Sequence, residues 1–207
     1  MLILAAFPPE LAPFSDSYRN GALTVGIGLV AAAHATASLV AALHPTSVLL
    51  VGSCGVYPAP RDQRTARPRP AIGSVVVAEN VVLVDSAAVR GDAALPEPMN
   101  ARAEVDRSTI ARFAEQGCVP AIVASTLGIT TSDSLAHALA ERSGADVENL
   151  EAFAVAEACA AAGIPCTVVL GITNVVGSEG RGQWRQNHVE VAMRVAHVVE
   201  RVLGRAP

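Results

Sequence analysis

Lysine is absent from the chain, and all fifteen basic residues are arginines. This absence excludes a catalytic Schiff-base lysine and the lysine of a P-loop. The formal net charge is −4, so no basic face for nucleic acid is expected. Aromatic residues make up only 3% of a chain that is 51% hydrophobic, so alanine and valine must fill most of the core.

Other chemistries lack their signatures as well. The chain has no G-x-S-x-G elbow and no H-E-x-x-H motif, and Gly26-Ile27-Gly28 lacks the third glycine of a dinucleotide fingerprint. The cysteines are scattered through apolar segments without metal-site spacing, so we expect buried thiols in a reducing cytoplasm, no metal and no other cofactor. They are Cys54, Cys118, Cys159 and Cys166.

The apolar segments do not predict a membrane protein. Met1 leads straight into apolar residues with no basic region, which is not the pattern of a signal peptide. Residues 20–60 contain no Asp, Glu, Lys or Arg, but glycine, proline and polar residues interrupt them every few positions. This pattern predicts a buried strand-helix-strand unit and no membrane span.

Apolar runs and helical segments alternate along the chain, with no repeat and no change of composition. We expect one domain over residues 1–207 with an α/β fold, a three-layer α/β/α sandwich. Residues 57–70, with four prolines and four arginines, and residues 91–100 predict exposed loops. The expected strands are 2–7, 23–27, 47–51, 72–84, 121–125 and 166–172, and the expected helices are 29–43, 106–116, 151–162 and 186–203, with another after Asp133.

Two acids three residues apart, Glu148 and Glu151, precede the Ala-rich helix. One interpretation is structural, in which Asp146 or Asn149 caps the helix and the acids answer the positive end of its dipole. The other is that Glu151 binds a ligand. Loops that follow the carboxyl ends of strands, such as 52–55, are where open α/β sheets place ligands, so complementary groups are expected there.

Six segments in order resemble the motif set of the purine nucleoside phosphorylase and nucleosidase superfamily. The resemblance covers most of the chain. It implies a mixed, twisted central sheet flanked by helices, cleavage of a purine ribosyl C–N bond, and a homodimer or larger assembly. The segments are the first strand followed by Glu10, then 26–32, 51–55, 72–77, 148–152 and 171–174.

The resemblance assigns roles residue by residue. Glu151 matches the acid that hydrogen-bonds the ribose hydroxyls, and an ionised carboxylate there favours the positive charge that develops on the sugar. Glu10 matches the carboxylate that activates water, although an exposed loop acid after two prolines is the other interpretation. Leu150 replaces a methionine under the sugar. The remaining expected substrate-binding residues are Ser53, Gly55, Asn149, Leu135, Arg181 and Trp184.

The expected nucleophile is water. Related phosphorylases carry an arginine before the segment matching 51–55, where this chain has Leu50, and a Pro-Gly-Asp-Pro type of loop where it has Pro8-Pro9-Glu10. A phosphate site without its cations is not expected. A phosphorylase acting on inosine or guanosine, and a purine-binding protein without catalysis, stay open as alternatives.

Asn174 stands where methylthioadenosine/adenosylhomocysteine nucleosidases, a third alternative, carry an aspartate that protonates adenine. An asparagine cannot supply a proton, but its amide can donate to N7 or O6 of a 6-oxopurine, so hypoxanthine fits better. With Arg181 and Trp184 following, this end of the chain resembles futalosine hydrolase, which releases hypoxanthine on a menaquinone route. The benzoate of futalosine could pair with Arg181 or with an arginine of residues 57–70. Where nucleosidases of this superfamily tend to stack an aromatic side chain on the base, this chain has only Leu135.

Overall fold

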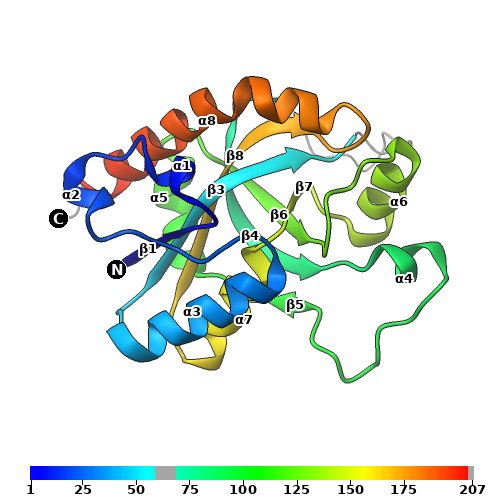
Figure 1. Cartoon of the computed structure of the whole chain (residues 1–207), viewed down its shortest axis with the longest axis horizontal. Coiled ribbons are helices and arrows are strands. Elements are labelled where there is room, and N and C mark those ends of the chain that lie inside the picture. Colours follow the sequence, from blue (N-terminus) through cyan, green and yellow to red (C-terminus); the bar gives the residue numbers. More distant parts are fainter. Residues whose placement is uncertain (59–68, 205–207) are drawn as a thin grey trace.

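The protein is built on one mixed β-sheet, seen in a computed structural model that describes residues 1–58 and 69–204 (Figure 1). We propose a single domain because this sheet takes strands from both ends of the chain. The strands are β1 (Leu2–Ala5), β2 (Leu23–Thr24), β3 (Val48–Val56), β4 (Val75–Leu83), β5 (Arg102–Ala103), β6 (Val119–Ser125), β7 (Val147–Asn149) and β8 (Cys166–Val175). The helices are α1 (Pro8–Leu11), α2 (Asp16–Arg19), α3 (Leu29–Leu43), α4 (Ser86–Arg90), the 3₁₀ turn η2 (Arg107–Thr109), α5 (Ile110–Ala114), α6 (Asp133–Ser143), α7 (Ala152–Ala161) and α8 (Gly180–Leu203).

Helices cover both faces of the sheet, which confirms the expected three-layer α/β/α class. In Figure 1, α8 lies along one face, and α3 and α7 lie against the other. Side chains alternate between the two cores because successive residues of a strand point to opposite faces. In β3, for example, Leu50 packs in the core beneath α3 and α7, whereas Leu49 and Val51 pack beneath α8.

Part of the sheet closes on itself. The strand order is β2-β1-β3-β7-β6-β4-β5, and β8 pairs in parallel with β3 and in antiparallel with β4. The strands β3, β7, β6, β4 and β8 therefore form a ring, in which β3 contacts β8 along its length and β7 near its carboxyl end. This arrangement brings the carboxyl ends of β3 and β8 together and places the short strand β7, antiparallel to β3, beside them.

Glu10 lies on a helix and not in an exposed loop. Pro8 and Pro9 occupy the first turn of α1, where the missing proline N–H costs no helical hydrogen bond. The helix turns Glu10 inward, and only 9% of its surface is exposed. The interpretation of Glu10 as a solvated loop acid is therefore wrong.

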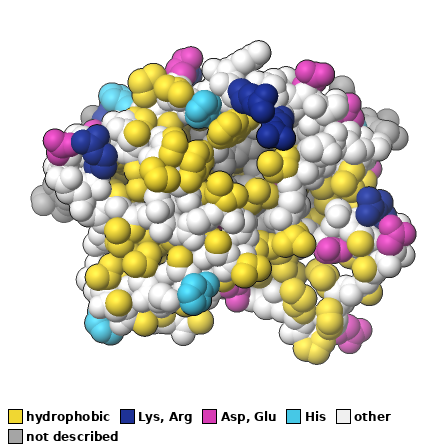
Figure 2. All heavy atoms as spheres, viewed as in Figure 1, with side chains coloured by type: hydrophobic (Ala, Val, Ile, Leu, Met, Phe, Trp, Pro, Cys, Tyr) yellow, Lys and Arg dark blue, Asp and Glu magenta, His cyan; other side chains and the backbone are white. Residues whose placement is uncertain are grey.

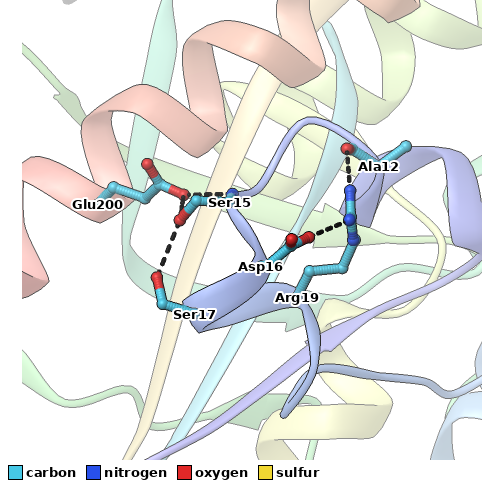
Figure 3. A network of polar contacts seen from close by, with 6 residues as sticks. All are labelled: Ala12, Ser15, Asp16, Ser17, Arg19 and Glu200. Atoms are coloured by element: carbon cyan, nitrogen blue, oxygen red, sulfur yellow. Dashed lines mark hydrogen bonds and ion pairs between the residues drawn. The ribbon is translucent and has the colours of Figure 1, made fainter.

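The segment after α1 is tied to the far end of α8. Glu200 Oε1 accepts hydrogen bonds from the backbone N–H of Ser15 at 2.7 Å and from its hydroxyl at 2.8 Å. In the same network, Arg19 pairs with Asp16 and donates to the carbonyl of Ala12 (Figure 3). The Ser15 contacts connect the start of α2 to α8, and the Arg19 contacts connect the end of α2 to the segment before it.

Several element boundaries differ from the expected ones. β3 continues to Val56, so residues 52–55 are strand and not loop, because β8 pairs with them throughout. The expected helix 106–116 is the short pair η2 and α5, and α8 begins at Gly180, six residues before the expected start. Residues 91–100 form neither helix nor strand, as expected. None of the helices in the described ranges is long and apolar enough to cross a membrane.

Candidate functional site

A cavity of about 550 Å³ opens beside β7 and the carboxyl-terminal parts of β3 and β8. Nearly all of the residues that the sequence singled out line it, and Leu135 does not. The lining residues with a predicted role are Glu10, Ser53, Gly55, Asn149, Leu150, Glu151, Asn174, Arg181 and Trp184. Segments far apart in sequence thus converge on one space large enough for a small organic ligand.

The Glu10 carboxylate is held in place by three donors. Its Oε2 accepts from the N–H of Ala6 at 3.1 Å, and its Oε1 accepts from the N–H and the hydroxyl of Ser53 at 2.9 and 3.0 Å. A carboxylate offers about four acceptor positions, so one position on Oε2 is left for a further donor. Gly52 allows this close approach, since a Cβ there would lie 3.0 Å from Oε1.

Burial raises the pKa of Glu10 to about 7. The nearby Glu151 carboxylate contributes to this rise, and the hydrogen bonds from Ser53 and Ala6 oppose it. A carboxyl group with this pKa exchanges its proton readily at neutral pH, as a general base requires.

Glu151 directly precedes α7, at its N-cap position, and lines the same cavity. Its Oε1 accepts from the N–H of Gly28 at 2.8 Å, and its Oε2 accepts from the amide of Asn149 at 3.1 Å. About two acceptor positions remain free, enough for a pair of hydroxyl groups. Burial raises the pKa of Glu151, and these two hydrogen bonds oppose the rise.

Asn149 both caps α7 and positions Glu151. Its amide oxygen accepts from the N–H groups of Glu151 and Ala152 at 2.9 and 2.8 Å, and its amide nitrogen also donates to the carbonyl of Ser53 at 3.0 Å. Glu151 occupies the N-cap position, but of the two proposed caps it is Asn149 whose side chain accepts from the first N–H groups of α7, whereas Asp146 accepts from the N–H of Ile122. Capping and ligand binding, posed as alternatives by the sequence, are compatible because the cap belongs to Asn149 and leaves Glu151 free.

A β-bulge aims Asn174 into the cavity. The pairing of β3 with β8 skips Thr173, so that Gly55 lies opposite Asn174. A Cβ at Gly55 would lie 2.8 Å from the Asn174 amide nitrogen, so only glycine leaves room for the side chain. The amide oxygen accepts from the Thr173 hydroxyl at 2.8 Å and the nitrogen donates to the Val175 carbonyl at 3.0 Å, which leaves one N–H for a ligand.

An aromatic group borders Glu10. Trp184 stacks on His188 with ring centroids 4.4 Å apart, and the ring of Phe7 lies 6.3 Å from Trp184. The spacing of four residues places Trp184 and His188 on one face of α8. Phe7 lines the cavity, and the sequence analysis gave it no role.

The expectation that Leu135 faces the base is not supported by its place in the fold. It lies on α6 and packs against the core cluster that contains Tyr57 and Leu139. Apolar surface in the cavity comes from Ile27 and Ile129 instead, whose exposed fractions are 64% and 66%. No pattern in the sequence singles out these two residues, because only the fold shows that they are exposed beside a cavity.

Glu148 is a third buried acid at this site. It accepts from the N–H and hydroxyl of Thr130 at 3.0 and 2.7 Å and from the Tyr57 hydroxyl at 3.0 Å. These bonds hold the segment containing Ile129 and Thr130 against the cavity. Glu148 thus supports the wall, and Glu151 keeps the free acceptor positions.

Arg181 is the only Arg among the described residues that line the cavity. It forms no hydrogen bond or ion pair with another described residue. Arg69 donates to the carbonyl of Tyr57 and does not line the cavity. Leu50, at the position where an arginine was expected in a phosphorylase, is buried in the core. Three other arginines of the predicted loop, Arg61, Arg64 and Arg67, lie outside the described residues.

Among the described residues, the acidic and basic side chains that line the cavity are Glu10, Glu148, Glu151 and Arg181. On the face shown in Figure 2, hydrophobic side chains are widely spread, and acidic side chains lie mostly toward the edge. In the described ranges, no cluster of three or more His, Cys, Asp or Glu side chains could hold a metal ion. Of the polar side chains that line the cavity, the two carboxylates Glu10 and Glu151 and the amide of Asn174 keep hydrogen-bonding positions for a ligand, and Arg181 adds a positive charge.

Comparison with known families matches residues 18–206 to the phosphorylase superfamily. The chain belongs to this superfamily. Futalosine hydrolase of Thermus thermophilus is 31% identical over 193 residues, which cover 88% of this chain and 80% of that protein. Futalosine hydrolase of Streptomyces coelicolor is 32% identical over 124 residues, which cover 57% of this chain and 53% of that protein.

Solved structures of a futalosine hydrolase and of a nucleosidase share the fold. Futalosine hydrolase of Helicobacter pylori superposes with a TM-score of 0.80 at 20% identity, covering 99% of this chain and 97% of that one. The 5′-methylthioadenosine/S-adenosylhomocysteine nucleosidase of the same organism gives 0.79 at 19% identity, with coverage of 99% and 97%. At these identities the likeness shows the fold alone, and it confirms the mixed central sheet that the family resemblance implied.

Proposed function

We propose that this protein hydrolyses the N-glycosidic bond of futalosine, releasing hypoxanthine in a route to menaquinone. The observation that carries the proposal is that Glu10 and Glu151 line one cavity, each with acceptor positions left free. Membership of the superfamily and the two futalosine hydrolases among its relatives support the choice of reaction and substrate.

The proposed reaction uses the free acceptor position on Glu10. A water that donates to Glu10 Oε2 gives up its proton there as its oxygen attacks C1′ of the ribose. The C1′–N9 bond breaks, and its electron pair leaves with the purine. Glu151 accepts from the ribose hydroxyls and stabilises the positive charge on the sugar, which is greatest in the transition state.

Asn174 is proposed to bind the leaving base. Its free N–H can donate to N7 or O6 of hypoxanthine and so stabilise the negative charge that the base acquires as the bond breaks. The base then takes its proton from solvent. Adenine lacks the O6 acceptor, so an amide at this position favours a 6-oxopurine.

Arg181 is proposed to bind the carboxylate of the substrate benzoate. Replacing it with leucine is expected to raise KM for futalosine about tenfold, because a partly exposed ion pair is lost, with little change in kcat. Inosine, which has no carboxylate, should be cleaved equally well by the wild-type protein and by Arg181→Leu. The matched control is Arg185→Leu, since Arg185 is an exposed residue of the same helix that does not line the cavity. An equal loss for futalosine and inosine in Arg181→Leu would contradict this role.

The test of the function is chromatography of purified protein incubated with futalosine, inosine and methylthioadenosine, each with and without phosphate. Free hypoxanthine from futalosine without phosphate is the expected result. Release that requires phosphate would assign the protein to the phosphorylases, and adenine from methylthioadenosine would overturn the role of Asn174. Binding of purines with every nucleoside left intact would indicate a protein without catalysis.

Assembly and location stay predictions. A homo-oligomer and a cytoplasmic site of action were expected from the sequence, and a small-molecule nucleoside is the partner that the cavity fits. Sedimentation of the purified protein would determine the assembly.

A further inference from the structure

Trp184 reaches Glu10 through one intermediate hydroxyl. The indole Nε1–H donates to Ser53 Oγ at 3.4 Å, and the Ser53 hydroxyl donates to Glu10 Oε1 at 3.0 Å. An indole N–H can only donate, whereas a serine hydroxyl carries one proton and accepts on its oxygen. While Ser53 Oγ accepts from Trp184, its own proton is therefore available for Glu10.

The indole ring is itself held in place. It stacks on His188 with an interplanar angle of 13°, and the Nδ1 of His188 lies 3.2 Å from the carbonyl of Trp184. Since a carbonyl oxygen only accepts, this contact is a hydrogen bond when Nδ1 carries the proton. One turn of α8 thus fixes the direction of the indole N–H.

We propose that Trp184 is a positioning residue, which holds the Ser53 hydroxyl in the orientation that donates to Glu10. The proposal rests on the proposed function, in which Glu10 is the base. A donated hydrogen bond stabilises the ionised form of Glu10, and the Ser53 hydroxyl already opposes the rise that burial causes in the pKa of this residue. Without the indole N–H, the hydroxyl is free to rotate toward other acceptors, and the proton affinity of Glu10 increases.

Other groups also act on Glu10 and must stay unchanged in the test. Glu151 on α7 raises its pKa through charge repulsion. Cys54 on β3 has its own pKa raised by burial and by the Glu10 charge, so it stays a neutral thiol. From α8, His188 lines a small cavity beside Glu10, and Arg181 lines the large one. The substitutions below remove only the Trp184 ring or its N–H, or the Ser53 hydroxyl.

The experiment is a ¹³C NMR titration of labelled glutamate carboxyl groups, in which Glu10→Gln identifies the Glu10 signal. Trp184→Phe keeps an aromatic ring for His188 and removes the N–H together with the five-membered ring of the indole, and we expect it to raise the Glu10 midpoint by about half a unit. Ser53→Ala is expected to raise it by up to about one unit. The double variant should match Ser53→Ala, because the indole acts only through the hydroxyl.

A second readout is the pH profile of kcat/KM for futalosine. Its acidic limb should move upward in Trp184→Phe by the same amount as the NMR midpoint, with activity recovered at higher pH. Trp184→Leu, which also removes the ring, should give the same shift. An unchanged midpoint in Trp184→Phe, or shifts that add in the double variant, would overturn the proposal. The NMR midpoint needs no turnover, so it tests the positioning role of Trp184 independently of catalysis. A protein that does not cleave futalosine would reject the proposed function, whatever the NMR midpoint.

Discussion

Replacing Glu10 with glutamine is expected to lower kcat/KM for futalosine by roughly 10²- to 10⁴-fold, the usual contribution of a positioned general base. The carboxylate is the group with a free acceptor position beside Ala6 and Ser53, and an amide cannot take the proton of the attacking water. The measurement is hypoxanthine release at saturating and at low futalosine. Glu115→Gln, an exposed glutamate away from the cavity, is the matched control and should keep full activity.

The folding of Glu10→Gln must be checked, because its amide nitrogen would face the N–H of Ala6 or of Ser53, which is also a donor. A donor left without an acceptor costs about 1–3 kcal/mol, so some loss of thermal stability is expected and is measured by calorimetry. Binding of hypoxanthine to the folded variant separates loss of the base from loss of the site. A folded Glu10→Gln that binds hypoxanthine and retains wild-type kcat/KM would reject Glu10 as the base.

The Glu10 pKa also sets the pH dependence of the wild-type protein. Because the base acts in its ionised form and its pKa is raised to about 7, kcat/KM should fall as pH decreases through about 7. An ordinary glutamate, at 4.5, would place this limb far lower. The limb should be absent from the residual activity of Glu10→Gln, and a wild-type limb near 4.5 would contradict the assignment.

Replacing Glu151 with glutamine is expected to lower kcat for futalosine by roughly 10²- to 10³-fold, comparable with the loss of one preorganised electrostatic group. The substitution removes a negative charge next to the ribose, and that charge matters most in the transition state. KM should change less than kcat, because the hydroxyls of the ground state carry little charge. Single-turnover release of hypoxanthine measures the chemical step.

A substrate that lacks the 2′-hydroxyl of the ribose provides the control for Glu151. On 2′-deoxyfutalosine, the wild-type protein should already have lost part of this interaction, so Glu151→Gln should cost less than on futalosine. The same loss on both substrates would indicate that Glu151 acts only through α7 and Asn149, as the capping interpretation of this segment requires. The Glu115→Gln control applies here as well.

The order of the main strands and helices could be predicted from the sequence because it depends on local patterns, namely apolar runs and the glycines and prolines that interrupt them. Helix α3 spans the predicted residues 29–43, and α7 and β8 lie close to their expected positions. The exposed-loop alternative for Glu10 was wrong because Pro8-Pro9 marks either a chain break or a first helical turn, and only packing decides between them. The early start of α8 at Gly180 likewise has no local signal, since Gly180 and Gly182 weaken the helical pattern.

By itself, the sequence determined the α/β class, the absence of lysine chemistry and the residue types at the ends of the strands. Those properties depend on composition and on short-range periodicity. The tertiary structure alone decided that β8 pairs with both β3 and β4, that a bulge turns Asn174 into the cavity, and that Ile27 and Ile129, not Leu135, supply apolar surface there. It also decided the proton affinity of Glu10. Each of these depends on burial and on contacts between segments far apart in the chain, which no local pattern encodes.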